Sequence, residues 1–183
     1  MADYYEQTIV QQIIPDADMT PLERLLLSRV FESERIDDGW YFFAEESPCS
    51  MIYATRAELE QALSSSPDIE STAHRGIVER LLTASDTDDI EIDSDLNDTC
   101  WERFFQDIVK RSKTLRYIIV ITAFACTKMR PEGFGGMARL ITRNTILGKS
   151  TNDVLEDFLS EAGLDAPQDS KTGDDPAATP ASE

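Results

Sequence analysis

Cysteine, histidine and basic side chains are all scarce in this 183-residue chain. The three cysteines (Cys49, Cys100 and Cys126) lack the spacing of a zinc site, and a sparse, odd set of thiols is typical of a reducing compartment. His74 is the only histidine, so a catalytic triad or a Cys–His pair has a single imidazole to use. We therefore expect no metal, no cofactor and no disulfide framework.

Long apolar runs are absent as well. The longest mostly apolar stretch, 117–126, is far shorter than the ~20 residues that span a bilayer, and the first residues show no basic segment followed by an apolar run. These features predict a cytoplasmic protein without membrane contact. A chain of this length forms one domain or two small ones and buries a sizeable core.

Negative charge is in excess: 35 acidic side chains against 17 basic ones give a net charge of −18. Residues 1–100 hold 23 acids and 6 bases, whereas 110–149 holds nine bases and one acid. The acidic excess argues against a nucleic-acid binder, whose affinity comes from Lys and Arg on phosphates. The acidic half and the basic segment either face each other in the fold or face different partners.

Residues 164–183 contain Pro, Ala, Ser, Thr and Asp but no aromatic residue. Such a segment cannot bury enough apolar surface to offset the entropy that it loses on ordering. The sequence therefore predicts a single domain over 1–163 and a disordered acidic tail over 164–183.

Capping signals and apolar periodicity predict the secondary structure. Thr20 and Glu23 form a capping box before a helix that ends near Val30, and Thr55 with Glu58 opens a second helix. The other expected elements are strands over 4–14, 40–43, 51–53 (the hairpin partner of 40–43), 90–92, 115–126 and 137–142, and helices over 69–82, after a third capping box at 99–102, and from 150 to 163.

The order of these elements predicts an α+β fold. We expect an antiparallel sheet with a ferredoxin-like split β-α-β core, an extra C-terminal hairpin strand, and helices mainly on one face. Stretch 115–126 is apolar on both alternating sides, which is typical of a central strand covered on both faces. The last helix is expected to bury Val154, Leu155, Phe158 and Leu159.

Segment 125–138 reads Ala-Cys-Thr-Lys-Met-Arg-Pro-Glu-Gly-Phe-Gly-Gly-Met-Ala, and Ala2-Asp3-Tyr4-Tyr5 precedes the first strand. Together these segments resemble a group of short uncharacterised bacterial and mobile-element proteins with a Tyr-rich first strand and a Cys-x4-Pro-x2-Phe-Gly-Gly hairpin. The resemblance covers the two ends of the chain. It implies a bacterial or mobile-element context and carries no assigned activity.

The glycine-rich loop in this segment is a candidate anion or small-molecule site, because glycines let backbone N–H groups approach an anion. A helix N-terminus normally follows such glycines, whereas here a strand is expected. The simpler interpretation is therefore a hairpin connection whose glycines adopt positive φ. The candidate residues are Cys126, Lys128, Arg130, Phe134, Gly135 and Gly136.

Acidic residues gather in two stretches. Stretch 86–98 fails the calcium-loop pattern, because Asp98 stands where that loop needs glycine and Phe104 where it needs glutamate. A solvated acidic surface is the simpler interpretation, and imitation of the DNA backbone is the sharper one. The candidate partner-binding residues are Asp37, Asp38, Glu45, Glu46, Asp86, Asp88, Asp89, Glu91, Asp93, Asp95 and Asp98.

These patterns favour a non-enzymatic interaction or regulatory protein of a bacterium or mobile element. We expect it to bind a protein with a basic surface, without direct nucleic-acid contact, through electrostatic steering and an apolar or aromatic anchor. A DNA-mimicking inhibitor of a nucleic-acid-binding host system is the specific case. One alternative is a small-molecule or enzymatic domain that uses 126–136, with Cys126, Lys128, Arg130 and Phe134 lining a cleft against the helices. Another is a homo-oligomer in which Arg139 and Arg143 on an exposed sheet face meet acidic neighbours. A Cys126–His74 pair is a separate catalytic possibility.

Overall fold

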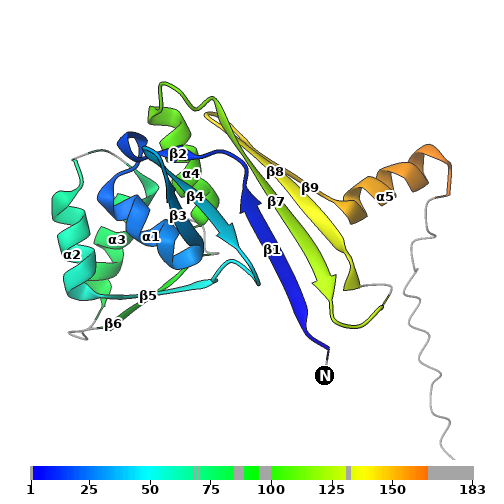
Figure 1. Ribbon diagram of the computed structural model, residues 1–183, viewed down its shortest axis with the longest axis horizontal. Coiled ribbons are helices and arrows are strands. Elements are labelled where there is room, and N and C mark those ends of the chain that lie inside the picture. Colours follow the sequence, from blue (N-terminus) through cyan, green and yellow to red (C-terminus); the bar gives the residue numbers. More distant parts are fainter. Residues whose placement is uncertain are drawn as a thin grey trace, which may run out of the picture. The chain divides into compact units, whose positions relative to one another are not determined.

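All strand pairings that the computed structural model describes are antiparallel (Figure 1). The described residues are 2–67, 69, 71–84, 89–94, 100–130 and 133–164. The main sheet has seven strands in the order β2-β4-β1-β7-β8-β9, with β3 on the other edge of β4, and β5 and β6 form a second sheet. The strands are β1 (Tyr4–Val10), β2 (Ile14–Pro15), β3 (Glu32–Ile36), β4 (Gly39–Ala44), β5 (Met51–Thr55), β6 (Asp89–Asp93), β7 (Tyr117–Cys126), β8 (Gly135–Thr142) and β9 (Ile146–Ser150).

Helices α1 and α4 contact strands of the main sheet, while α2 packs against α1 and α3 against α1 and α4. The predicted α+β class is confirmed. The two predicted capping boxes are present: the hydroxyls of Thr20 and Thr55 accept from the N–H groups of Glu23 and Glu58, whose carboxylates accept from the threonine N–H groups. The third box includes Thr99, which lies outside the described residues. The helices are α1 (Pro21–Val30), α2 (Arg56–Ser65), α3 (Thr72–Thr83), α4 (Trp101–Arg111) and α5 (Thr151–Glu161), with a 3-10 turn, η1 (Asp16–Asp18).

The predicted hairpin between 40–43 and 51–53 is wrong. β4 pairs instead with β3, through a turn at Asp37, which has a positive φ of 52°. β5 pairs with β6, so the predicted strand at 90–92 exists but belongs to the second sheet. β3 (Glu-Ser-Glu-Arg-Ile) is absent from the predicted elements because it is mostly polar, and the ferredoxin-like arrangement is not confirmed.

Aromatic packing between α4 and the main sheet forms the centre of the core. The ring of Phe105 lies 5.9 Å from that of Phe31 and 5.8 Å from that of Phe42, and Trp101 meets Phe31 edge-on at 5.2 Å. Burying each such ring contributes about 1.5–3 kcal/mol. The predicted apolar stripe of α4 is thus confirmed, and all its members are buried: Trp101, Phe104, Phe105, Ile108 and Val109.

A buried ion pair joins α1 to the end of α4. The carboxylate of Glu23, which is fully buried, accepts from the N–H of Thr20 (2.9 Å) and from the guanidinium of Arg111. Arg111 also donates to the backbone oxygen of Asp18 (3.2 Å), and the carboxylate of Asp18 accepts from the hydroxyl of Ser112 (2.6 Å). Burial raises the pKa of Glu23, while Arg111 acts in the opposite direction. Here the basic segment does pair with the acidic half of the chain.

The chain divides into two units, Met1–Thr151 and Asn152–Glu183. In the second unit, none of the residues of α5 is buried, so the prediction that this helix buries Leu155, Phe158 and its other apolar side chains is wrong. Among the described residues of this unit, α5 is the only helix or strand, so no second layer covers its apolar side chains. The predicted tail over 164–183 lies outside the described residues beyond Leu164.

Gly39 at the start of β4 leaves no room for a side chain. An added Cβ would lie 2.6 Å from Cγ2 of Ile13 and 2.8 Å from the carbonyl oxygen of Ile14. We expect Gly39→Ala to lower the free energy of unfolding by about 1–3 kcal/mol because of overpacking. Gly148→Ala is the matched control, since its Cβ would meet Cγ of Arg139 at 3.6 Å and the carbonyl oxygen of Ala138 at 3.8 Å, which are ordinary contacts. Equal urea midpoints for the two variants would contradict this prediction.

Candidate interaction surface

The two sides of the main sheet are chemically different because the strand registers sort alternate residues. Val10, Phe42 and Val120 point toward the helices, and each is fully buried. Their neighbours along the strands point to the opposite side, where the register places Ile9 directly between Phe43 and Ile121. We call the first side the helix face and the second the open face.

The open face is an apolar band that crosses five strands. Tyr41 and Phe43 of β4 stack with their ring centroids 5.3 Å apart. Ile9 remains 42% exposed and Leu147 57% exposed, although they lie in the middle and at the β9 edge of the sheet. The prediction that β7 is covered on both sides is therefore wrong for one side. The apolar residues of the open face are Tyr5, Ile9, Tyr41, Phe43, Tyr117, Ile119, Ile121, Ala123, Ala125, Ala138, Leu140 and Leu147.

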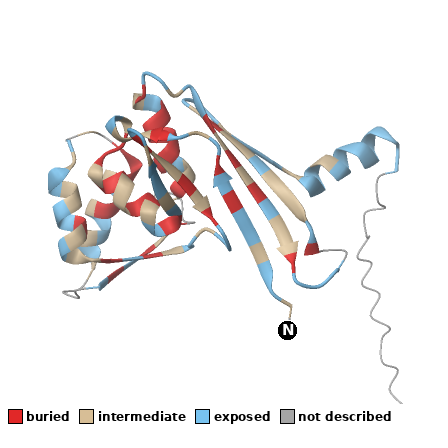
Figure 2. Ribbon diagram, viewed as in Figure 1, coloured by how far each residue is buried: buried red, intermediate tan, exposed pale blue. Residues whose placement is uncertain are grey.

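Two hollows indent the open face. The first, of about 400 Å³, is lined chiefly by Ile9, Tyr41, Phe43 and Ile121. The second, of about 430 Å³, lies toward β9 between Ile119, Leu140 and Leu147. Each hollow is large enough to accept one or two large apolar side chains of a partner, which is how a protein interface is anchored. In Figure 2, most residues of β1 and of β9 are coloured as exposed.

Carboxylates border one side of the open face. Glu32 and Glu34 of β3 pair with Phe43 and Tyr41, so their side chains share the open face, and both glutamates are exposed. Glu45 follows β4, lines the first hollow, and donates its backbone N–H to the carboxylate of Glu32 (3.2 Å). The three glutamates make this border acidic.

The acidic residues predicted to bind a partner occupy separate places. Asp37 and Asp38 form the β3–β4 turn, at one end of β4, and Glu45 and Glu46 follow its other end. Asp89, Glu91 and Asp93 lie along β6 in the second sheet. The remaining predicted residues, Asp86, Asp88, Asp95 and Asp98, lie outside the described part of the chain.

The described residues of the 126–136 hairpin pack closely around Cys126. Cys126 is 7% exposed, and a Cβ on Gly133 would lie 2.7 Å from its Cβ, so close packing requires this glycine. None of the described glycines of the loop has positive φ. The loop places Lys128, Arg130 and Phe134 at the surface, while Gly136 donates its N–H to the hydroxyl of Thr151 (3.3 Å), and a Cβ on Gly135 would approach the same oxygen. These residues line neither hollow of the open face.

The thiols and the histidine do not form a catalytic pair among the described residues. Cys100 contacts the carboxylate of Glu102, and burial raises the pKa of Cys100 to about 11, so this thiol stays protonated. His74 is half-buried on α3, its Nδ1 has no hydrogen-bond partner, and no bond links it to Cys126. No group of three metal-ligating side chains occurs in the described segments.

Basic residues of 110–149 are partly neutralised within the fold. Lys110 pairs with Asp107 (2.8 Å), and Arg139 pairs with Glu102 (3.3 Å) while its guanidinium lies 5.4 Å from the centre of the Trp101 ring. Arg139 therefore lies on the helix face, and the expectation that it shares an exposed sheet face with Arg143 is wrong. Strand alternation alone does not tell which side the helices cover.

Comparison with known proteins gives no match: no protein family, no curated protein and no solved structure is similar to this chain. The resemblance at 125–138 therefore stays a prediction. Within the described residues, no helix combines the length and the apolar character needed to cross a membrane.

Proposed function

We propose that this chain is a non-enzymatic cytoplasmic interaction protein that binds a basic partner protein through the open face. The observation that supports this is an apolar sheet face that α1 to α4 leave uncovered. Contiguous exposed apolar surface with a polar rim is typical of a protein-binding site. The two hollows give the partner places to insert apolar anchors.

The charge of the border defines the chemistry of the partner. Glu32, Glu34 and Glu45 surround the β3–β4 side of the band, and the whole chain carries −18. A partner with Lys or Arg side chains is therefore attracted at long range by the carboxylates. Its apolar anchors then bind at short range in the two hollows. A regulatory role in a bacterium or mobile element and imitation of DNA remain predictions within this proposal.

A photo-reactive side chain at Phe43 tests the proposal directly. We expect p-benzoylphenylalanine at this position, irradiated in cells of the native host, to form a covalent product with a basic protein. The same group at Leu82, which is 81% exposed on α3, is the matched control and should give no such product. Adding Ile121→Glu should abolish the Phe43 product. A product that contains only two copies of this chain would instead favour self-assembly, and no product would count against any partner on this face.

The acidic border is expected to set the association rate. Replacing Glu32, Glu34 and Glu45 together by glutamine should slow association with the captured partner about tenfold at low salt, because long-range attraction is lost. Stopped-flow or surface binding across salt concentrations measures this effect, and the difference should shrink at high salt because charges are screened.

A second triple variant separates this border from the other acidic residues. Asp37→Asn, Asp38→Asn and Glu91→Gln remove the same total charge outside this border, from the β3–β4 turn and from β6 of the second sheet. This variant should associate nearly as fast as the wild type. If it is the slower of the two, the partner binds the acidic surface predicted from sequence rather than the open face.

A further inference from the structure

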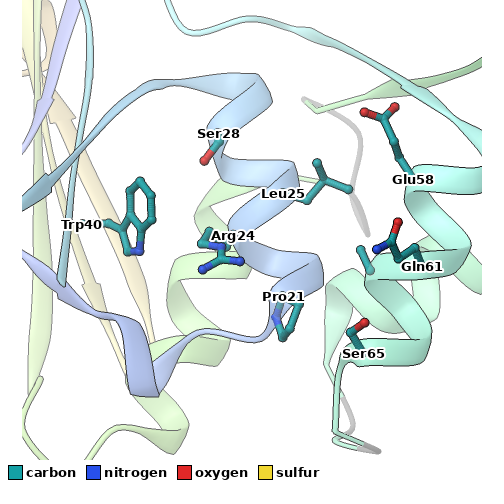
Figure 3. A pocket seen from close by; sticks show the side chains of 9 residues that line it. Pro21, Arg24, Leu25, Ser28, Trp40, Glu58, Gln61 and Ser65 are labelled. Carbon is teal, nitrogen blue, oxygen red and sulfur yellow. The ribbon is translucent and has the colours of Figure 1, made fainter. Parts of the chain in front are cut away.

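A groove of about 480 Å³ lies on the helix side of the fold, away from the open face. Side chains of α1, among them Arg24 and Leu25, line the middle of the groove. Figure 3 shows Trp40 on one side of this helix and the side chains of α2 on the other. The two helices run antiparallel, since Leu22 bonds to Ser66 (3.1 Å) at one end and Arg29 pairs with Glu58 (3.0 Å) at the other. We call this the Trp40 groove; it is lined by Pro21, Arg24, Leu25, Ser28, Trp40, Glu58, Gln61, Ala62 and Ser65.

Two guanidinium groups lie close to the indole of Trp40, and of these Arg24 lines the groove. Those of Arg24 and Arg35 each lie 5.7 Å from the centre of the Trp40 ring. Both pair with Asp16, at 3.3 Å and 3.7 Å, and the indole N–H of Trp40 donates to the same carboxylate (2.8 Å). The carboxylate therefore fixes all three side chains while both arginines stay partly exposed.

This cluster carries a net positive charge within a strongly acidic protein. The hydrogen bond from Trp40 lowers the pKa of Asp16, with smaller contributions from Arg24 and Arg35, so the carboxylate is ionised at neutral pH. One negative charge then stands against two positive ones. Each guanidinium has five N–H donors, and the bonds to Asp16 use only part of them.

The other charged group of the groove is already satisfied. Glu58 accepts from the backbone N–H and the hydroxyl of Thr55 (2.9 Å each) and pairs with Arg29. The rest of the lining is apolar, from Pro21 and Leu25, or neutral and polar. The volume and this mixture match small-molecule sites, in which an apolar surface is combined with a few polar groups that orient the ligand.

We propose that the Trp40 groove binds a small organic anion with a flat apolar part. The carboxylate, sulfonate or phosphate group of such a ligand meets the guanidinium of Arg24 in charge-assisted hydrogen bonds, and Arg35, outside the lining, adds to the attraction for an anion. Its flat part lies along the wall formed by Trp40 and against Leu25 and Ala62. This site is independent of the partner surface, because Trp40 points to the helix face.

The two indole N–H signals in a proton–nitrogen NMR spectrum test the proposal, because the chain has two tryptophans and only Trp40 borders the groove. We use 2-naphthoate as the probe, and Trp40→Phe assigns the signals. The Trp40 signal should shift in a saturable manner, while that of Trp101, which is 5% exposed in the core, stays in place. The uncharged 2-naphthamide should bind about tenfold more weakly. No shift at Trp40, or equal affinity for the amide, would overturn the proposal.

Four variants distinguish a ligand-binding role of Arg24 and Asp16 from a purely structural role. Arg24→Gln should weaken 2-naphthoate about tenfold, whereas Arg116→Gln, which removes an exposed charge outside the groove, should leave the affinity within about twofold. Asp16→Asn keeps an acceptor for the indole and should strengthen binding several-fold. Unchanged or weaker binding in Asp16→Asn contradicts the proposal, and so does loss of binding in Phe43→Ala, which would place the probe on the open face.

Discussion

Arg111→Met is expected to lower the free energy of unfolding by about 3–5 kcal/mol at neutral pH. The reason is the partner that it leaves behind: Glu23 is fully buried, and Arg111 is the cation that pairs with its carboxylate. A buried charge without its partner costs about that much, even where the intact pair contributes little by itself. Urea unfolding followed by far-UV circular dichroism measures the effect.

The loss in Arg111→Met should depend on pH in one direction. Burial already raises the pKa of Glu23, and removal of Arg111 takes away an influence that lowers it, so this pKa rises further. A carboxyl with a raised folded-state pKa stabilises the fold below its unfolded pKa and loses that contribution as pH rises through the folded pKa. The variant should therefore be closer to the wild type at about pH 5 than at about pH 8.

Neutralising both partners is the matched control. Glu23→Gln combined with Arg111→Met keeps an oxygen that accepts from the N–H of Thr20 and leaves neither charge of this ion pair in place. The double variant should recover most of the free energy of unfolding that Arg111→Met loses. Its stability should also depend less on pH than that of Arg111→Met. If the double variant is as unstable as Arg111→Met, apolar contacts or the bond from Arg111 to Asp18 account for the effect instead.

The parts of the fold that sequence predicts are those fixed by local chemistry. Thr20 with Glu23 and Thr55 with Glu58 close their capping boxes within four residues, and both helices begin where these pairs predict. The stripe of α4 repeats at helical spacing, and its residues are buried together. In each case the interaction that sets the element lies inside the element, so no knowledge of the rest of the chain is needed.

Pairing between strands depends on distant residues and is predicted less well. Stretches 40–43 and 51–53 look like a hairpin by proximity, yet β3 takes that edge of β4 and β5 finds β6 almost forty residues away. The sequence did not predict the open face for a related reason. β7 is apolar on both sides, which predicts two covering layers, and only the fold shows that helices cover one of them. The charged cluster beside the Trp40 groove likewise joins four different elements, which contribute Asp16, Arg24, Arg35 and Trp40.

Phe42 and Phe43 are neighbours in β4, and their replacement by alanine should have opposite effects on stability and on partner binding. Phe42→Ala is expected to destabilise the fold by about 3–5 kcal/mol, because its fully buried ring packs edge-on against Phe105. Phe43→Ala should cost about 1 kcal/mol or less, since it removes mainly the stacking on Tyr41 and the cross-strand contact with Ile9.

Binding reverses this order, which separates the function of the open face from the stability of the fold. Phe43 lines the first hollow, so Phe43→Ala should weaken the cross-linked partner about tenfold or more. Phe42→Ala, measured at a temperature where it remains folded by circular dichroism, should bind within about threefold of the wild type, because its ring does not reach the open face. If both variants lose binding in proportion to their stability, the open face has no direct part in recognition, and the partner instead detects the folded state as a whole.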